Sequence, residues 1–212
     1  MAFQTATGAL VASLGVLVLE ALGGIAGAIM LQPGTHTTLS GYFSFQDNRA
    51  WFTAWNINYH VVLSQSSLWF AALVGLVTFC ASLFTWYAKR EHGHVVTGLL
   101  WWTAASLIGL FMARDLVVFY IFFELMLVPT FLLVGVWGGE RRVAAAMRFF
   151  LFTMVGSVAM LVGIIALGTS KGTFDYVDLI GALSKPGGAL GGETAMWLFV
   201  AFTLAFAIKV PL

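Results

Sequence analysis

Apolar residues in this chain gather in long runs that are separated by shorter polar stretches. A helix rises 1.5 Å per residue, so it needs about 20 mainly apolar residues to cross the hydrocarbon core of a bilayer. Six segments approach this length, and they cover residues 8–31, 68–88, 95–113, 116–137, 149–168 and 195–212. The pattern predicts an all-α fold, a polytopic bundle of transmembrane helices that forms a single membrane domain over residues 1–212.

The polar stretches between these runs differ in length, and the two longest cover residues 32–67 and 169–194. Both are rich in Gly, Ser, Thr and Pro, which is typical of loops. We expect one short interfacial helix inside the second loop, around residues 174–183. The third and fourth runs are joined only by Arg114 and Asp115, which predicts a tight turn with local charge compensation.

Composition agrees with a membrane protein and excludes other classes. The chain is 60% apolar and only 9% charged, whereas about a quarter of the residues of a soluble domain are charged. The net charge of +1 argues against a nucleic acid partner. The single cysteine, Cys80, cannot form a disulfide framework within the chain. We expect no secretory signal peptide, because the N-terminus lacks a basic region and the first apolar run is too long.

Basic residues in the short connections predict the orientation of the bundle, because cytoplasmic loops carry an excess of Lys and Arg. One side holds Lys89, Arg90, Arg141, Arg142 and Arg148, and we expect it to face the cytoplasm of a cell whose inner membrane contains this multi-pass protein. The basic residues of the other side lie mostly in longer loops that also carry acidic residues. They are Arg49, Arg114, Lys171 and Lys185.

A histidine pair lies in the connection between the second and third apolar runs. His92 and His94 have the spacing of two metal ligands, but no third ligand is close to them in the sequence. We therefore expect both side chains to be solvent-exposed.

Three ionisable residues lie inside the apolar runs, and they are Glu20, Glu124 and Lys209. A charge at membrane depth costs about 3 kcal/mol on insertion scales, so such residues persist where they pair, face water or carry ions. Glu20 lies in a glycine-rich run, which favours a carboxylate at a close helix–helix interface.

Glu124 and Lys209 each lie beside a proline, Pro129 and Pro211 respectively. Proline removes a backbone donor and frees the carbonyl four residues earlier, which for Pro129 is that of Leu125. Interrupted helices are tolerated at membrane depth only inside protein or along a cavity. One acid and one base on two such helices are the minimum for a proton path. The alternative is a structural ion pair that holds two helices together.

Four stretches of this sequence resemble the antiporter-like membrane subunits of respiratory complex I. They are FFELMLVP at 122–129, GVWGGERR at 135–142, RFFLFT at 148–153 and AFAIKVPL at 205–212. The M-type subunit of NADH:quinone oxidoreductase, equivalent to mitochondrial subunit four, is the most similar type. The resemblance is dense over residues 111–212 and looser before them.

The resemblance implies that Glu124 and Lys209 form a proton-channel pair in the first of two inverted repeats. Glu124 would set how tightly Lys209 holds its proton, and Lys209 would load and release it. The chain would be the N-terminal part of a proton-translocating subunit of an enzyme complex. It would hold no cofactor itself, because NADH, FMN, iron–sulfur clusters and quinone belong to partner subunits in this family. Its partners would be neighbouring membrane subunits and the lipid bilayer.

The sequence also departs from the family pattern. Members have two helices before the first long loop, where one apolar run is found here, and they are longer than this chain. An aspartate that follows that loop in the family is absent from residues 62–67. Two other functions remain open: a subunit of a cation/proton antiporter or membrane-bound hydrogenase of the same superfamily, and a non-catalytic membrane scaffold.

Overall fold

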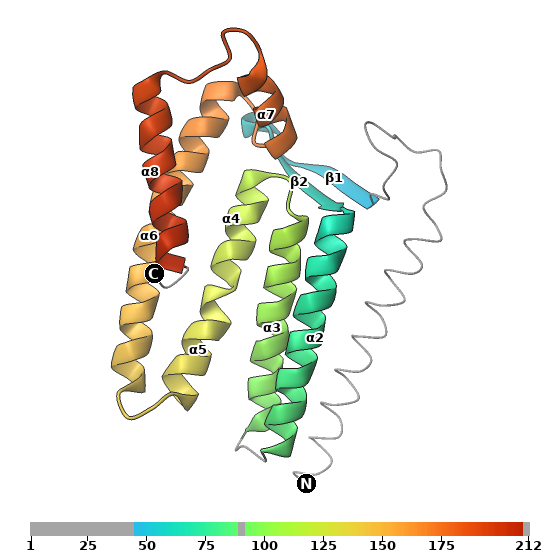
Figure 1. Ribbon diagram of the computed structural model, residues 1–212, viewed down its shortest axis with the longest axis vertical. Helices are drawn as coiled ribbons and strands as arrows, with labels where there is room; N and C mark the ends of the chain where they lie inside the picture. The colour runs from blue at the N-terminus through green and yellow to red at the C-terminus, as the bar shows by residue number, and fades with distance from the viewer. Residues whose placement is uncertain (1–44, 89–91, 210–212) are drawn as a thin grey trace. The chain divides into compact units, whose positions relative to one another are not determined.

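A computed structural model describes residues 45–88 and 92–209, and within them the fold is a set of apolar helices (Figure 1). Five spans in this part are long and apolar enough to cross a membrane. They are Gln65–Tyr87 (α2), Gly93–Met112 (α3), Leu116–Leu125 (α4) together with Leu127–Trp137 (α5), Arg142–Lys171 (α6), and Gly192–Lys209 (α8). The predicted fold class, a polytopic helix bundle, is confirmed. The first apolar run, with Glu20, and Pro211 lie outside the described residues.

The described residues divide into two compact units, of which one includes residues 62–112 and the other residues 47–61 and 113–209. The prediction of a single domain over the whole chain stays a prediction. In the first unit α2 packs against α3. Ser64 caps the N-terminus of α2, and Ser67 donates to the carbonyl of Phe111 at 3.0 Å. Phe70 stacks on Phe111 with 4.7 Å between ring centroids, so the start of α2 lies beside the end of α3.

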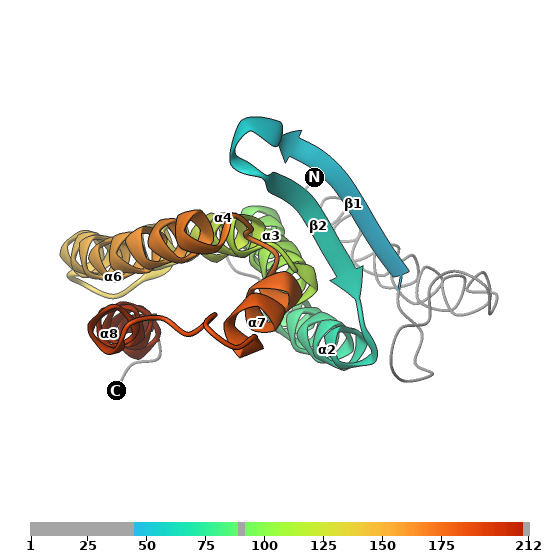
Figure 2. The same cartoon turned by 90° about the horizontal axis from the view of Figure 1, so that it is seen from above.

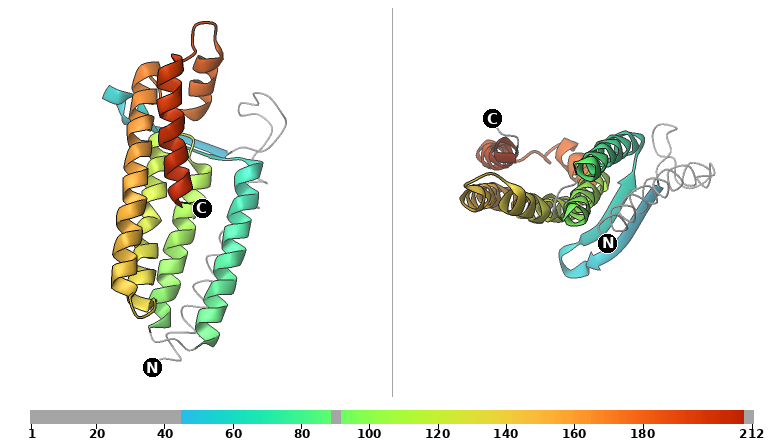
Figure 3. Two further views of the ribbon diagram at one scale, coloured as in Figure 1. Left: turned by 60° about the vertical axis from the view of Figure 1, so that its left-hand side comes forward. Right: turned by 90° about the horizontal axis from the view of Figure 1, so that it is seen from below.

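The second unit is built around α6, which packs against α5 and α8 (Figure 3). Small residues on α6 allow α8 to approach closely, as is typical of helix packing in membranes. The position of a Cβ atom on Gly156 would lie 2.8 Å from Ile208, and one on Gly163 would lie 3.3 Å from Phe202. These contacts place the last turn of α8, with Lys209, beside the middle of α6.

The fourth apolar run is not one regular helix, because it is interrupted at Met126 between α4 and α5. Pro129 is fully buried in the first turn of α5 and has no N–H to donate to Leu125. The Thr130 hydroxyl donates to the carbonyl of Met126 at 2.8 Å. The interruption therefore lies where the sequence predicted an irregularity, beside Glu124.

The prediction of a plain loop over residues 32–67 is wrong for its described part. Phe45–Phe52 (β1) and Ile57–Leu63 (β2) form a two-stranded sheet, closed by the short 3-10 turn Thr53–Trp55 (η1). Figure 2 shows β1 and β2 as neighbouring arrows of opposite direction. Aromatic and β-branched residues favour strands here, and Asn56 adopts the left-handed conformation (φ 54°) that the turn requires. The Gly and Pro residues at 33–41, just before these strands, led to the prediction of a loop for the whole stretch.

The short helix expected around residues 174–183 is present as Tyr176–Ser184 (α7). Asp175 caps it, with its carboxylate accepting from the backbone N–H groups of Val177 at 2.9 Å and Asp178 at 3.2 Å. A carboxylate in this position satisfies backbone donors that have no partner within the helix.

The connection between α3 and α4 is the middle segment of a three-segment backbone network. The N–H of Arg114 donates to the carbonyl of His60 at 2.9 Å on one side. On the other side Tyr176 donates to Arg114, and Leu116 donates to Phe174, both at 2.9 Å. The predicted tight turn is therefore not a purely local structure, because segments far apart in the sequence hold this link in an extended conformation.

Gly168→Ala should destabilise the second unit, because a Cβ atom at this position would overlap the ring of the buried Phe174. Phe174 would have to move, and its carbonyl accepts the hydrogen bond from Leu116. Overpacking of this kind costs about 1–3 kcal/mol, and we expect a lower midpoint of thermal unfolding in detergent. Gly98→Ala is the matched control, because nothing lies within 4 Å of a Cβ atom there. Equal midpoints for the two variants would contradict the packing described.

Candidate functional site

Lys209 lies in the last turn of α8 and reaches the end of α4. Its Nζ donates to the carbonyl oxygen of Phe123 at 3.3 Å and lies 4.1 Å from the centroid of the Phe123 ring. Phe123 is buried, and Phe206 packs against its ring edge-on at 6.4 Å. The ammonium group is therefore held by a carbonyl dipole and by the face of one aromatic ring.

The end of a helix favours a cation because its last carbonyl groups lack helical partners and carry partial negative charge. α4 ends at Leu125, and Phe123 belongs to its final turn. From the sequence we expected the freed carbonyl of Leu125 to form a local polar site beside Glu124. The structure instead brings Lys209 to Phe123, two residues earlier, where Phe206 of α8 also packs against the Phe123 ring.

Glu124 is half-buried on the same turn of α4 and interacts electrostatically with Lys209. Within the described part of the chain no direct ion pair within 4.0 Å joins them. Tyr120 lies one turn earlier on the same face of α4 and interacts electrostatically with Glu124 and with the buried Ser157 of α6. Tyr120, Phe123 and Ser157 were not predicted from the sequence. The spacing of four residues between Tyr120 and Glu124 was the available signal.

A second group of polar side chains, here called the link cluster, consists of His60, Arg114, Asp115 and Asp175. Nδ1 of His60 lies 2.6 Å from Oδ2 of Asp175, and Nε of Arg114 lies 3.2 Å from the same oxygen. The expected compensation between Arg114 and Asp115 is wrong. Arg114 pairs with a residue 61 positions away, because the backbone network brings the two segments together.

The two carboxylates of the link cluster have opposite electrostatic surroundings. Asp115 is 1% exposed, and burial raises its pKa, to which the nearby charge of Asp175 contributes. It accepts from the backbone N–H groups of Val117 at 2.8 Å and Asn58 at 3.3 Å. Burial alone would raise the pKa of Asp175 too. The backbone N–H of Asp178, the Arg114 charge and the His60 hydrogen bond outweigh it and lower that pKa.

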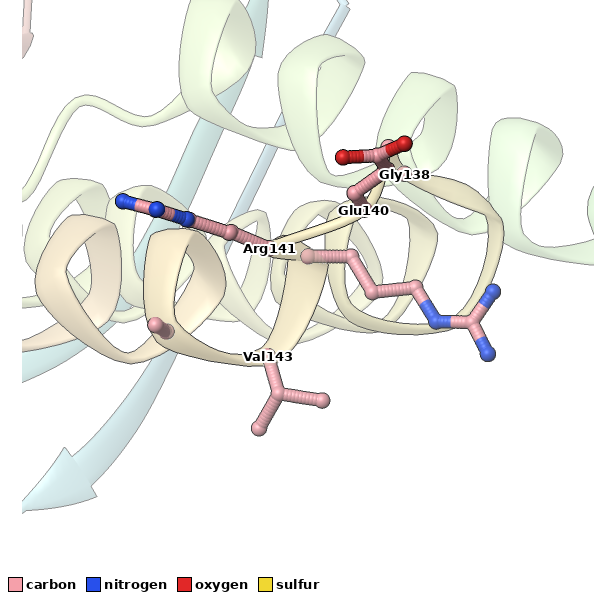
Figure 4. Close-up of a pocket in the computed structure, with 7 residues that line it drawn as sticks. Gly138, Glu140, Arg141 and Val143 are labelled. Carbon is pink, nitrogen blue, oxygen red and sulfur yellow. The ribbon is translucent and has the colours of Figure 1, made fainter.

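The remaining candidate residues lie at the surface. Arg141, Arg142 and Arg148 are exposed, and the first two line a shallow depression over residues 138–144 together with Glu140. Figure 4 shows the side chains of Glu140 and Arg141 extending in different directions. His92 and His94 are exposed as expected, with ring centroids 6.3 Å apart. Across residues 45–88 and 92–209, no three His, Cys, Asp or Glu side chains gather as metal ligands.

Apolar spans, an interrupted helix and a lysine held at the interruption are the features of a multi-pass membrane protein. Residues 113–212 match the family described as NADH:quinone oxidoreductase/Mrp antiporter, transmembrane. This match confirms the resemblance found in the sequence.

Individual relatives agree with this assignment. The chain is 35% identical over 177 residues to NADH-quinone oxidoreductase subunit M of Rhodobacter capsulatus, an alignment that covers 79% of this chain and 34% of that one. It is 36% identical over 175 residues to F(420)H(2) dehydrogenase subunit M of Methanosarcina mazei, with the same two coverages. Its fold matches a chain of respiratory complex I from Thermus thermophilus with a TM-score of 0.69 and 28% identity, covering 100% of this chain and 44% of that one. The chain spans about one third of the length of the curated relatives it matches.

The opposite pKa shifts predict opposite pH dependences of stability. The stability that Asp115 contributes is present below its unfolded pKa of about 3.9 and is lost as the pH rises through its higher folded pKa. Asp115→Asn, which still caps the helix, should therefore gain stability relative to the native chain as the pH rises from 4 towards 7. The measurement is the thermal midpoint in detergent as a function of pH.

The contribution of Asp175 has the other sign, because it is present above a pKa of about 3.9 and is lost as the pH falls through the lower folded pKa. Asp175→Asn should lose about 2 kcal/mol near pH 7, as expected for lost charge-assisted hydrogen bonds. Its deficit should shrink in acid. Asp178→Asn, exposed in the first turn of α7, is the control. Parallel pH profiles for Asp115→Asn and Asp175→Asn would contradict these assignments.

Proposed function

We propose that this chain is the N-terminal part of a proton-translocating membrane subunit of NADH:quinone oxidoreductase, in which Glu124 and Lys209 carry protons. The similarity to NADH-quinone oxidoreductase subunit M of Rhodobacter capsulatus supports the assignment to this enzyme complex. The observation that carries the proton path is the position of Lys209, whose ammonium group meets the end of α4 one residue from Glu124.

The surroundings of Lys209 suit a group that gains and loses a proton. Its charged form is stabilised by the Phe123 carbonyl, the Phe123 ring and the more distant charge of Glu124. If Glu124 and Lys209 formed only a structural ion pair, a short, direct contact would join them. Lys209 instead makes a 3.3 Å contact to a neutral carbonyl. The equilibrium between its protonated and neutral forms can therefore shift when Glu124 changes its charge or position. Lys209 would then release its proton, and Glu124 would accept or gate the next one.

In this proposal the redox chemistry belongs to partner subunits that hold FMN, iron–sulfur clusters and quinone and that oxidise NADH. The present chain contributes proton transfer driven by those partners, and neighbouring antiporter-like subunits would flank it in the inner membrane. The exposed arginines of the turn between α5 and α6 would face the cytoplasm.

A second candidate keeps the proton path but changes the driving reaction. The F(420)H(2) dehydrogenase relative is as similar as the NADH-quinone oxidoreductase relative, and the family description includes Mrp antiporters. A cation/proton antiporter or a membrane-bound hydrogenase would use the same Glu124 and Lys209. The subunits that co-purify with the full-length protein distinguish these cases.

Replacing the two ionisable residues tests the proton path directly. In the assembled, full-length complex, Lys209→Ala and Glu124→Ala should reduce the protons pumped per electron pair in proteoliposomes more than they reduce assembly. Removing an acid–base group typically lowers the rate of proton transfer about 100-fold or more. The protons that this subunit contributes per electron pair should therefore be lost. Lys209→Arg should not restore it, because arginine does not release its proton.

Lys185→Ala is the matched control, because Lys185 is exposed at the end of α7. Normal pumping by an assembled Lys209→Ala complex would exclude the proposed role. Poor assembly with unchanged pumping per complex would support the scaffold instead.

Pro129→Ala tests the interrupted helix without removing any charge. Alanine restores the missing N–H, so α4 and α5 can join and the final carbonyls of α4 become engaged. We expect the complex to assemble with at least several-fold slower proton transfer through this subunit, because Lys209 would lose the helix end that stabilises its charge. Pro186→Ala, in the exposed loop after α7, should pump normally. Unchanged pumping by Pro129→Ala would show that the interruption is dispensable.

A further inference from the structure

The link cluster contains a buried histidine that the proposed proton path does not use. His60 is 7% exposed, and it lies on β2, outside the membrane spans. Its Nδ1 is 2.6 Å from Asp175, whereas its Nε2 is buried and has no hydrogen-bond partner among residues 45–88 and 92–209. Buried polar atoms without partners are uncommon, and each one needs a physical explanation.

The partners of Asp175 determine which nitrogen of His60 carries the proton. Asp175 accepts hydrogen bonds from the backbone of Val177 and Asp178 and from the Arg114 side chain. A carboxylate that accepts from this many donors is ionised, so its short contact to His60 requires a proton on Nδ1. The neutral ring then keeps its lone pair on Nε2, in the manner in which a carboxylate orients a histidine that acts as a base.

The link cluster carries more negative than positive charge when His60 is neutral. The groups that face His60 are Asp175 at the start of α7, together with Arg114 and Asp115 in the link before α4. When His60 is neutral, the cluster contains two carboxylates, those of Asp115 and Asp175, and one guanidinium, that of Arg114. The helix N-termini offset part of this negative charge, but Asp115 has no cationic side chain within 4.0 Å in the described part of the chain. A proton on Nε2 would balance the cluster.

We propose that Asp175 and His60 form a proton-binding dyad, with the exchangeable proton on Nε2 of His60. Asp175 acts as a positioning residue, because it fixes the tautomer and orientation of the ring. Arg114, whose side chain is 28% exposed, forms the part of the cluster nearest to solvent. This site lies outside the membrane spans and is distinct from Glu124 and Lys209, so it does not depend on the function proposed above.

The direct test is solid-state nitrogen NMR of the full-length protein, labelled only at histidine and embedded in lipid bilayers. The signals that disappear in His60→Gln belong to His60. At pH 8 we expect one protonated nitrogen, Nδ1, and one unprotonated nitrogen, Nε2. On lowering the pH to 5, the range in which histidines change charge, the Nε2 signal should shift to the protonated position. If His60→Gln does not fold, His92→Gln and His94→Gln assign the two exposed histidines and help to isolate the His60 signal.

Two further variants separate a dyad from a histidine that merely packs. Asp175→Asn should move the proton to Nε2 at pH 8, whereas Asp178→Asn on the same helix should leave the signal unchanged. The proposal is overturned if the native ring carries its proton on Nε2 at pH 8. It is also overturned if Nε2 stays unprotonated down to pH 5, as expected for a neutral histidine that binds only water.

Discussion

The contact between the Lys209 ammonium and the end of α4 ties the membrane-embedded charges to the architecture of the second unit. Pro129 lacks an N–H, so α4 ends at Leu125. A cation is favoured at such a helix end, and close packing of α8 on Gly156 and Gly163 delivers Lys209 to Phe123. A proline, two glycines and a lysine on three helices thus produce one site, and the stability of the charge depends on all of them.

The opposite end of the same unit depends on a different constraint, the pairing of extended backbone segments. The two-residue link before α4 is too short to form a sheet by itself, but β2 and the start of α7 provide hydrogen bonds on its two sides. This arrangement buries Asp115 at the first turn of α4 and brings Arg114 and His60 to Asp175. α4 is therefore anchored by a capped N-terminus at one end and meets Lys209 at the other.

The hydrophobic pattern was sufficient to predict the helices, because membrane spans have a minimum length that few other segments satisfy. The interruption of the fourth apolar run was also predictable, because proline disrupts a helix, whereas the roles of Glu124 and Lys209 stay predictions. The two-stranded sheet of β1 and β2 and the link cluster were not predicted. The His60–Asp175 contact joins residues 115 positions apart, and no local pattern marks it. The contact of Lys209 with Phe123 and not with Leu125 depends on how the end of α8 packs against Phe123, and no local pattern in the sequence marks this packing.

An experimental density map of the full-length, assembled complex at side-chain resolution is the most direct test of how Lys209 is held. The account predicts that α4 ends at Leu125 and that Nζ of Lys209 lies against the carbonyl and ring of Phe123, without a direct contact to Glu124. A continuous helix through residues 116–137, with Lys209 turned away from Phe123 or paired directly with Glu124, would contradict it.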